Sequence, residues 1–242
     1  MTNESTTTPS AKRDWLVPAL LLGLSAVPVV AGAFRLAELS VGAKVTPDNA
    51  RFFAAPVPIV LHILSVSAFS VLGAFQFSSG FRRRKPRWHR AAGWAVAPSG
   101  LVAAASGLWM QASYELPRGD GDALAVLRVL FGSAMFMSLV LGLVAISRRD
   151  FVRHGAWMLR GYAIGLGAGT QVLTHMPWVL LFGAPGEGVR AVLMGTGWVI
   201  NVAVAEWIIQ RRATSLRKEK QPSAQRRPAV VPSIARLIGS SD

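Results

Sequence analysis

Six long stretches of the chain carry almost no charged residues, and they constrain the fold more than any other feature. They cover about residues 15–34, 56–78, 91–112, 123–146, 156–182 and 189–210. Roughly 20 apolar helical residues cross a hydrocarbon core about 30 Å thick, so each stretch is long enough to span a bilayer. Polar or Gly- and Pro-rich segments such as VTPDNAR, ELPRGDGD and GAPGEG separate them. The sequence therefore predicts an all-α polytopic membrane protein with six transmembrane helices.

The predicted organisation has three parts. Residues 15–212 form the six-span domain, in which the second to fifth helices pack as a four-helix bundle. Residues 1–14 and the basic tail 213–242 are polar, so both are expected to be disordered. The first span could instead be a signal peptide, since a small-residue sequence, Ala31-Gly32-Ala33, ends its apolar run. The length of this run and the following Arg35 favour an uncleaved anchor.

Basic residues are distributed unevenly between the two predicted sides of the membrane. The net charge of +14 would suggest nucleic-acid binding in a soluble protein. The connections on one side hold 19 Lys and Arg residues, whereas the other side holds five: Arg35, Lys44, Arg51, Arg118 and Arg190. The positive-inside rule predicts that the first side, with both termini, faces the cytoplasm, and the expected location is the cell membrane. This bias accounts for the net charge, so the expected partner is the lipid bilayer and not nucleic acid.

Several classes of site are missing from the sequence. The absence of cysteine excludes disulfides, thiolate-ligated haem, iron–sulfur clusters and covalently attached haem c. There is no GxGxxG, Walker or HExxH motif, and no nucleophile-plus-base signature. Carboxylates are scarce inside the predicted spans, where a proton-coupled transporter would usually carry several. The sequence therefore assigns no catalytic residue.

The four histidines fall at two depths in the predicted spans. His62 and His175 lie toward the outer side, whereas His89 and His154 begin spans at the inner side, each after a basic turn. Two histidines at matching depth on facing helices can ligate a metal or a haem b, so the pairs predict one or two b-type haems. The alternatives are a headgroup-facing role for the inner pair and an interhelical hydrogen bond for the outer pair. His154 and His175 are about 31 Å apart along one helix, which disfavours two stacked haems.

Three charged residues lie away from the very ends of the predicted spans. Arg160 and Glu206 fall at similar depth, which predicts a structural ion pair because unpaired charges are so unfavourable there. Arg128 lies near the outer side, where it could hold a haem propionate, pair with an outer-loop acid such as Asp122, or extend to water.

Glycines recur at every fourth position of the fifth span, which predicts close helix packing or room for a flat macrocycle: Gly161, Gly165 and Gly169.

Short motifs in a fixed order resemble a known family. A histidine early in the second span precedes a terminal QF pair; HRAAG follows the basic run RRRKPRW, and RHGAWMLR opens a later helix. This order resembles a family of predicted bacterial membrane proteins catalogued as domain of unknown function twenty-three-oh-six. The likeness covers roughly residues 55–210 and includes these positions: His62, Gln76, Phe77, His89, Arg90, Gly93, His154, Trp157, Met158 and Arg160. Gly155 stands where the family pattern favours arginine. The resemblance implies a multi-pass membrane protein and no established activity.

Three functional hypotheses remain open at this point. The first is electron transfer through one or two b-type haems, with a quinone or another redox protein as partner, because the histidine placement is also similar to di-haem b-type cytochromes. The second is a cofactor-free membrane scaffold or partner subunit. The third is a transporter for a small solute.

Overall fold

A computed structural model of the protein describes residues 11–117 and 119–220. Arg118 and the segments 1–10 and 221–242, which include most of the predicted disorder, lie outside the described residues. All regular secondary structure of the described residues is helical. In chain order the helices are α1 (Ala11–Ser40), α2 (Ala50–Ala54), α3 (Pro56–Gln76), α4 (Ser79–Arg84), α5 (Pro86–Ser113), α6 (Asp122–Ser147), α7 (Phe151–Gly165), α8 (Gly167–Phe182) and α9 (Glu187–Lys220).

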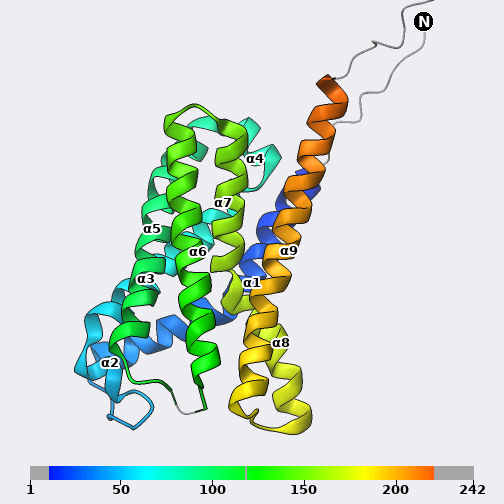
Figure 1. The fold of residues 1–242 in the computed structure, drawn as a ribbon. Coiled ribbons are helices and arrows are strands. Elements are labelled where there is room, and N and C mark those ends of the chain that lie inside the picture. Colours follow the sequence, from blue (N-terminus) through cyan, green and yellow to red (C-terminus); the bar gives the residue numbers. More distant parts are fainter. Residues whose placement is uncertain (1–10, 118, 221–242) are drawn as a thin grey trace, which may run out of the picture. The chain divides into compact units, whose positions relative to one another are not determined.

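Five of the described helices are long and apolar enough to cross a membrane. They comprise α3, α5 and α6 together with Trp15–Ser40 of α1 and Glu187–Ser215 of α9. The predicted all-α membrane class is thus confirmed. In Figure 1, α4 and the turn between α6 and α7 lie at one end of the helices, which we call the basic end, and the loop between α5 and α6 lies at the other, which we call the opposite end.

The stretch expected as the fifth span differs from the prediction, because it forms two helices in place of one. The 15 residues of α7 and the 16 residues of α8 meet at Leu166, which belongs to neither. Glycines flank Leu166 on both sides. Among the amino acids, only proline disfavours a continuous helix more than glycine does. The sequence pattern LRGYAIGLGAGTQ therefore interrupts a stretch whose length and apolar character alone predict one span.

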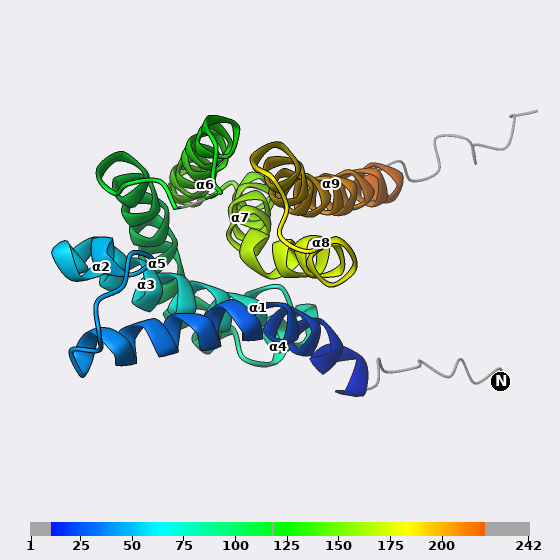
Figure 2. The ribbon, with the colours of Figure 1, turned by 90° about the horizontal axis from the view of Figure 1, so that it is seen from below.

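Helices α3, α5, α6 and α7 lie side by side, as the end-on view in Figure 2 shows. Their shared interior contains Phe69, Met135, Leu139 and Tyr162, all buried. Glycines allow the close approach: an added Cβ would lie 2.5 Å from the Phe69 ring at Gly100 and 2.8 Å from Leu139 at Gly161. Lipid tails are as apolar as leucine, so such shape-matched contacts, and not a hydrophobic driving force, hold helices together in a membrane. The close packing predicted for the glycine repeat is observed.

The two terminal spans are longer than predicted. Helix α1 runs on to Ser40, so Arg35 lies inside the helix and pairs with Glu38 at 2.6 Å. The chain divides into two compact units at Glu206 and Trp207, and the described part of the second unit is the C-terminal end of α9. This end continues as helix to Lys220, past the expected boundary at residue 212, because RRATSLRKEK contains neither glycine nor proline.

Candidate functional site

The break between α7 and α8 leaves backbone groups that a neighbouring helix satisfies. The Leu166 amide donates to the Tyr162 carbonyl at 3.0 Å, but no backbone bond in the described residues joins the Gly167 amide to the Ala163 carbonyl. The Asn201 side chain of α9 donates to that free carbonyl at 3.0 Å, and Thr170 fixes the Asn201 amide with a 2.8 Å bond to its oxygen. A carbonyl freed by a helix break needs such a partner wherever water does not reach it.

Helix α1 crosses α8 close to this break. Pro28 has no amide hydrogen, so the Leu24 carbonyl one turn earlier has no helical partner. That carbonyl lies directly against Gly169 of α8, where any larger residue would clash with it. A proline in one helix and a glycine in the other thus set the crossing of α1 over α8.

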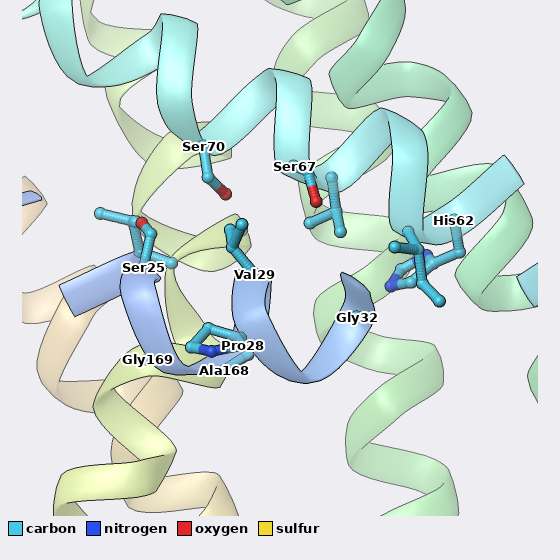
Figure 3. Close-up of a pocket in the computed structure, with 13 residues that line it drawn as sticks. Ser25, Pro28, Val29, Gly32, His62, Ser67, Ser70, Ala168 and Gly169 are labelled. Atoms are coloured by element: carbon cyan, nitrogen blue, oxygen red, sulfur yellow. The ribbon is translucent and has the colours of Figure 1, made fainter. Parts of the chain in front are cut away.

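A cavity of about 150 Å³ lies between α1, α3 and the α7–α8 break. Figure 3 shows the two sides formed by α1 and α3, with the first turn of α8 below. The lining residues are small, apolar or hydroxyl-bearing, with one imidazole: Ser25, Pro28, Val29, Gly32, His62, Ile63, Val66, Ser67, Ser70, Gly165, Leu166, Ala168 and Gly169. None of them carries a fixed charge, so the cavity favours an uncharged occupant.

Three serine hydroxyls border the cavity. Ser67 and Ser70 lie one helical turn apart on α3 and point toward α1 in Figure 3. Ser25 faces them from α1 and donates to the Leu21 carbonyl at 2.9 Å. The Ser67 and Ser70 hydroxyls form no hydrogen bond with any described residue. Each hydroxyl can donate one hydrogen bond and accept others, so the two groups favour a polar molecule in the cavity.

His62 lines the same cavity, and its ring is hydrogen-bonded to α5. Its Nδ1 lies 2.9 Å from the Ala103 carbonyl of α5 and 3.3 Å from the Ser106 hydroxyl. A carbonyl only accepts, so Nδ1 is the donor and Nε2 of the neutral ring is left as an acceptor. The predicted partner, His175, lies on α8, and its pairing with His62 around a haem stays a prediction. His62 itself makes an interhelical hydrogen bond, which was the alternative role expected for the outer pair.

His89 and His154 occupy equivalent positions at the basic end. Each is the fourth residue of its helix. The His89 amide donates to the Lys85 carbonyl, and the His154 amide donates to the Asp150 carbonyl, in each case just before the helix begins. His154 donates from Nδ1 to the Gly142 carbonyl at 2.9 Å, whereas the buried Nδ1 of His89 has no hydrogen-bond partner in the described structure. His154 and Arg82 lie near His89. Across residues 11–117 and 119–220, no three His, Cys, Asp or Glu side chains group as they would around a metal ion.

Two ionic contacts tie α9 to the rest of the first unit. Arg160 of α7 binds Glu206 through two bonds, Nε to Oε1 at 2.5 Å and Nη2 to Oε2 at 2.9 Å. At the opposite end the buried Asp120 lies 2.5 Å from Arg128 and 2.7 Å from Arg190. The contacts of Asp120 have the distances of ion pairs, but their angles are not those of hydrogen bonds. The acid beside Arg128 is therefore Asp120, and not Asp122.

The fold and these sites define an all-helical integral membrane protein with polar groups inside its spans. Residues 59–209 match the family described as predicted membrane protein (DUF2306), and the chain belongs to this family. The resemblance predicted from the ordered motifs is thus confirmed. No curated protein and no solved structure shows significant similarity to the chain. The matched region begins inside α3, so the α1 wall of the cavity lies outside it.

Proposed function

We propose that this protein carries a small uncharged polar solute across the membrane, with the cavity at the α7–α8 break as its binding site. The observation that supports this most directly is the pair of hydroxyls, Ser67 and Ser70, that face the cavity without a partner. A cavity of about 150 Å³ is large enough for a benzene-sized molecule. The expected ligand therefore has about six non-hydrogen atoms and bears hydroxyl, amide or similar uncharged groups.

The interrupted helix supports transport as well as binding. Solute sites in many transporters are formed by discontinuous helices near the bilayer midplane. On this proposal α7 and α8 together cross the membrane as one interrupted span, which completes six spans with the basic end in the cytoplasm of the cell. A reporter fused after Arg212 should then be cytoplasmic, and one inserted after Glu115 should be external. Any other result would overturn the six-span arrangement.

Solute uptake by proteoliposomes tests the transport proposal. We expect light scattering after an osmotic step to show faster entry of glycerol, urea, acetamide or ethylene glycol than in protein-free vesicles. Ser67→Leu would fill the cavity and abolish the difference. Thr196→Leu is the matched control, because Thr196 is exposed on α9 and bonds only its own helix. Uptake equal to that of empty vesicles for all four solutes would contradict the proposal.

The histidines at the basic end favour a second candidate, a b-type haem held by His89 and His154 for one-electron transfer to a quinone or a redox protein. His154 donates Nδ1 to a backbone carbonyl, as metal-ligating histidines almost always do, which leaves Nε2 free. The buried, unpartnered Nδ1 of His89 agrees with this, and the nearby Arg82 would pair with a propionate. At about 150 Å³ the cavity beside His62 suits a small solute and not a macrocycle, so this candidate uses the histidines of the basic end.

A visible difference spectrum, reduced minus oxidised, tests the haem candidate on protein purified after expression with ample haem. His89→Ala and His154→Ala should each abolish a b-type signal, whereas His175→Ala should leave it unchanged. Protein without this signal would rule out the haem candidate. If solute uptake were also absent, the remaining hypothesis would be a cofactor-free scaffold or partner subunit.

A further inference from the structure

The short helix α4 is fixed to the ends of its neighbours by a cluster of aromatic rings. The Phe81 ring centre lies 4.7 Å from that of Trp88 in α5 and 5.8 Å from that of Phe75 in α3. Phe75 in turn contacts Trp88 at 5.8 Å and Trp15 of α1 at 5.9 Å. This aromatic cluster joins four helices at the basic end. It therefore holds α4 in one position against the spans.

The chain following Phe81 carries a dense set of cations on this support. Residues 79–90 contain six basic and no acidic residues. Arg82, Arg83 and Arg87 are exposed. The Ser78 hydroxyl caps α4 by accepting from the Phe81 amide at 3.3 Å, and the Lys85 amide closes its last turn on the Phe81 carbonyl at 2.9 Å. The positive charge is thus displayed by a folded turn and not by a flexible tail.

We propose that this basic turn, residues 82–90, is a binding site for the headgroups of anionic phospholipids. Tryptophan and tyrosine concentrate at the membrane–water interface, so the aromatic cluster sets the neighbouring cations at headgroup depth. Clusters of four to eight Lys or Arg next to a transmembrane helix attract anionic lipids, with about 1 kcal/mol, or about fivefold in affinity, per cation near the surface. The guanidinium groups of Arg82, Arg83 and Arg87 would bind phosphate oxygens directly.

The other turn at the basic end provides a matched control. The segment from Arg148 to Arg153 has three arginines, but Asp150 lies among them and accepts from the Arg153 amide at 3.0 Å. Phe151 beside it is exposed and belongs to none of the aromatic contacts of α4. The two turns therefore offer the same number of arginines for replacement, but only the first combines them with an aromatic cluster and no acid.

Lipid titration of the purified full-length protein in a neutral detergent tests the proposal, with bound lipid counted by native mass spectrometry. We expect phosphatidylglycerol to bind about tenfold or more tightly than phosphatidylcholine, and inorganic phosphate not to compete. The triple change Arg82→Gln, Arg83→Gln, Arg87→Gln should remove this preference, and the corresponding three Arg→Lys changes should retain most of it. The control Arg148→Gln, Arg149→Gln, Arg153→Gln should weaken binding much less than the first triple change, because Asp150 already offsets part of the charge of that turn.

Two outcomes would overturn the proposal. Equal losses in both glutamine variants would mean that the positive surface acts diffusely and has no built site. A wild-type protein that binds the two lipids equally would mean that no anionic headgroup is recognised. The lysine variant guards against misfolding, because it preserves the charge at the same positions.

Discussion

The helix group α3, α5, α6 and α7 is held together differently from α8 and α9. In the first group, rings and aliphatic chains fill the space left by glycines, as Phe69 does at Gly100 and Gly165. Between α8 and α9, where Trp198 packs against Gly167, polar bonds add to the packing: Gln171 donates to the Met194 carbonyl at 3.0 Å and Thr174 to the Leu193 carbonyl at 2.9 Å. Interlocked packing permits few arrangements, whereas individual hydrogen bonds can be exchanged one at a time.

The cavity lies where these two kinds of contact meet. Its α3 wall belongs to the interlocked group, and Ala168 and Gly169 at the start of α8 belong to the part attached by polar bonds. Asn201 bridges the two, since it binds the Ala163 carbonyl of α7 and the Thr170 hydroxyl of α8. A shift of α8 relative to α7 would therefore change the cavity without disturbing the interior around Leu139.

The largest effect is expected at the ion pair that attaches α9. Glu206→Gln leaves Arg160 without its counter-charge. The two side chains are part-buried and Glu206 lies in a candidate span, so the expected cost is about 3 kcal/mol, the low end for a buried pair. Hydrogen exchange should rise in α9 and remain slow in α5 and α6. The double change Arg160→Met with Glu206→Gln should recover much of the stability, as measured by thermal unfolding in detergent. Additive losses in the double variant would show that the two side chains do not stabilise one another.

An intermediate effect is expected in the interlocked group. Gly100→Val places new atoms where Phe69 and Leu139 already lie, and overpacking of this kind costs about 1–3 kcal/mol. Gly93→Val in the same helix is the control, since a Cβ there meets nothing within 4 Å. The thermal midpoint should fall for the first variant only. Similar midpoints for both would show that the glycines of α5 are not needed for close packing.

A smaller effect is expected at the break itself. Asn201→Leu removes the partners of the Ala163 carbonyl and the Thr170 hydroxyl, and interhelical hydrogen bonds in membranes contribute about 0.6 kcal/mol on average. The expected loss is about 1 kcal/mol, with faster hydrogen exchange confined to α8. An increase in exchange that spread equally to α3 and α5 would contradict the division into two regions.

Helix positions followed from the sequence, whereas the polar contacts mostly did not. Long apolar stretches predicted the spans, and the depth of Arg160 and Glu206 placed them within reach of each other. The break at Leu166 was not predicted, because its two flanking glycines match the small-residue spacing that also favours continuous packed helices. His62 was assigned a partner by depth alone, and depth does not fix the rotation of a helix about its axis. The roles of Ser67 and Asn201 depend on that rotation.

The absence of cysteine from the chain allows the most direct test of the solute cavity. In the variant Ser67→Cys the new thiol is the only one in the protein, and a thiol reacts as its thiolate, which needs access to water. In proteoliposomes we predict that methyl methanethiosulfonate, a small uncharged reagent, modifies Ser67→Cys and that urea or acetamide at high concentration slows the reaction. The lipid-facing control Thr196→Cys should remain unmodified. Equal, slow modification of both variants, unaffected by solute, would contradict a cavity that takes its ligand from water.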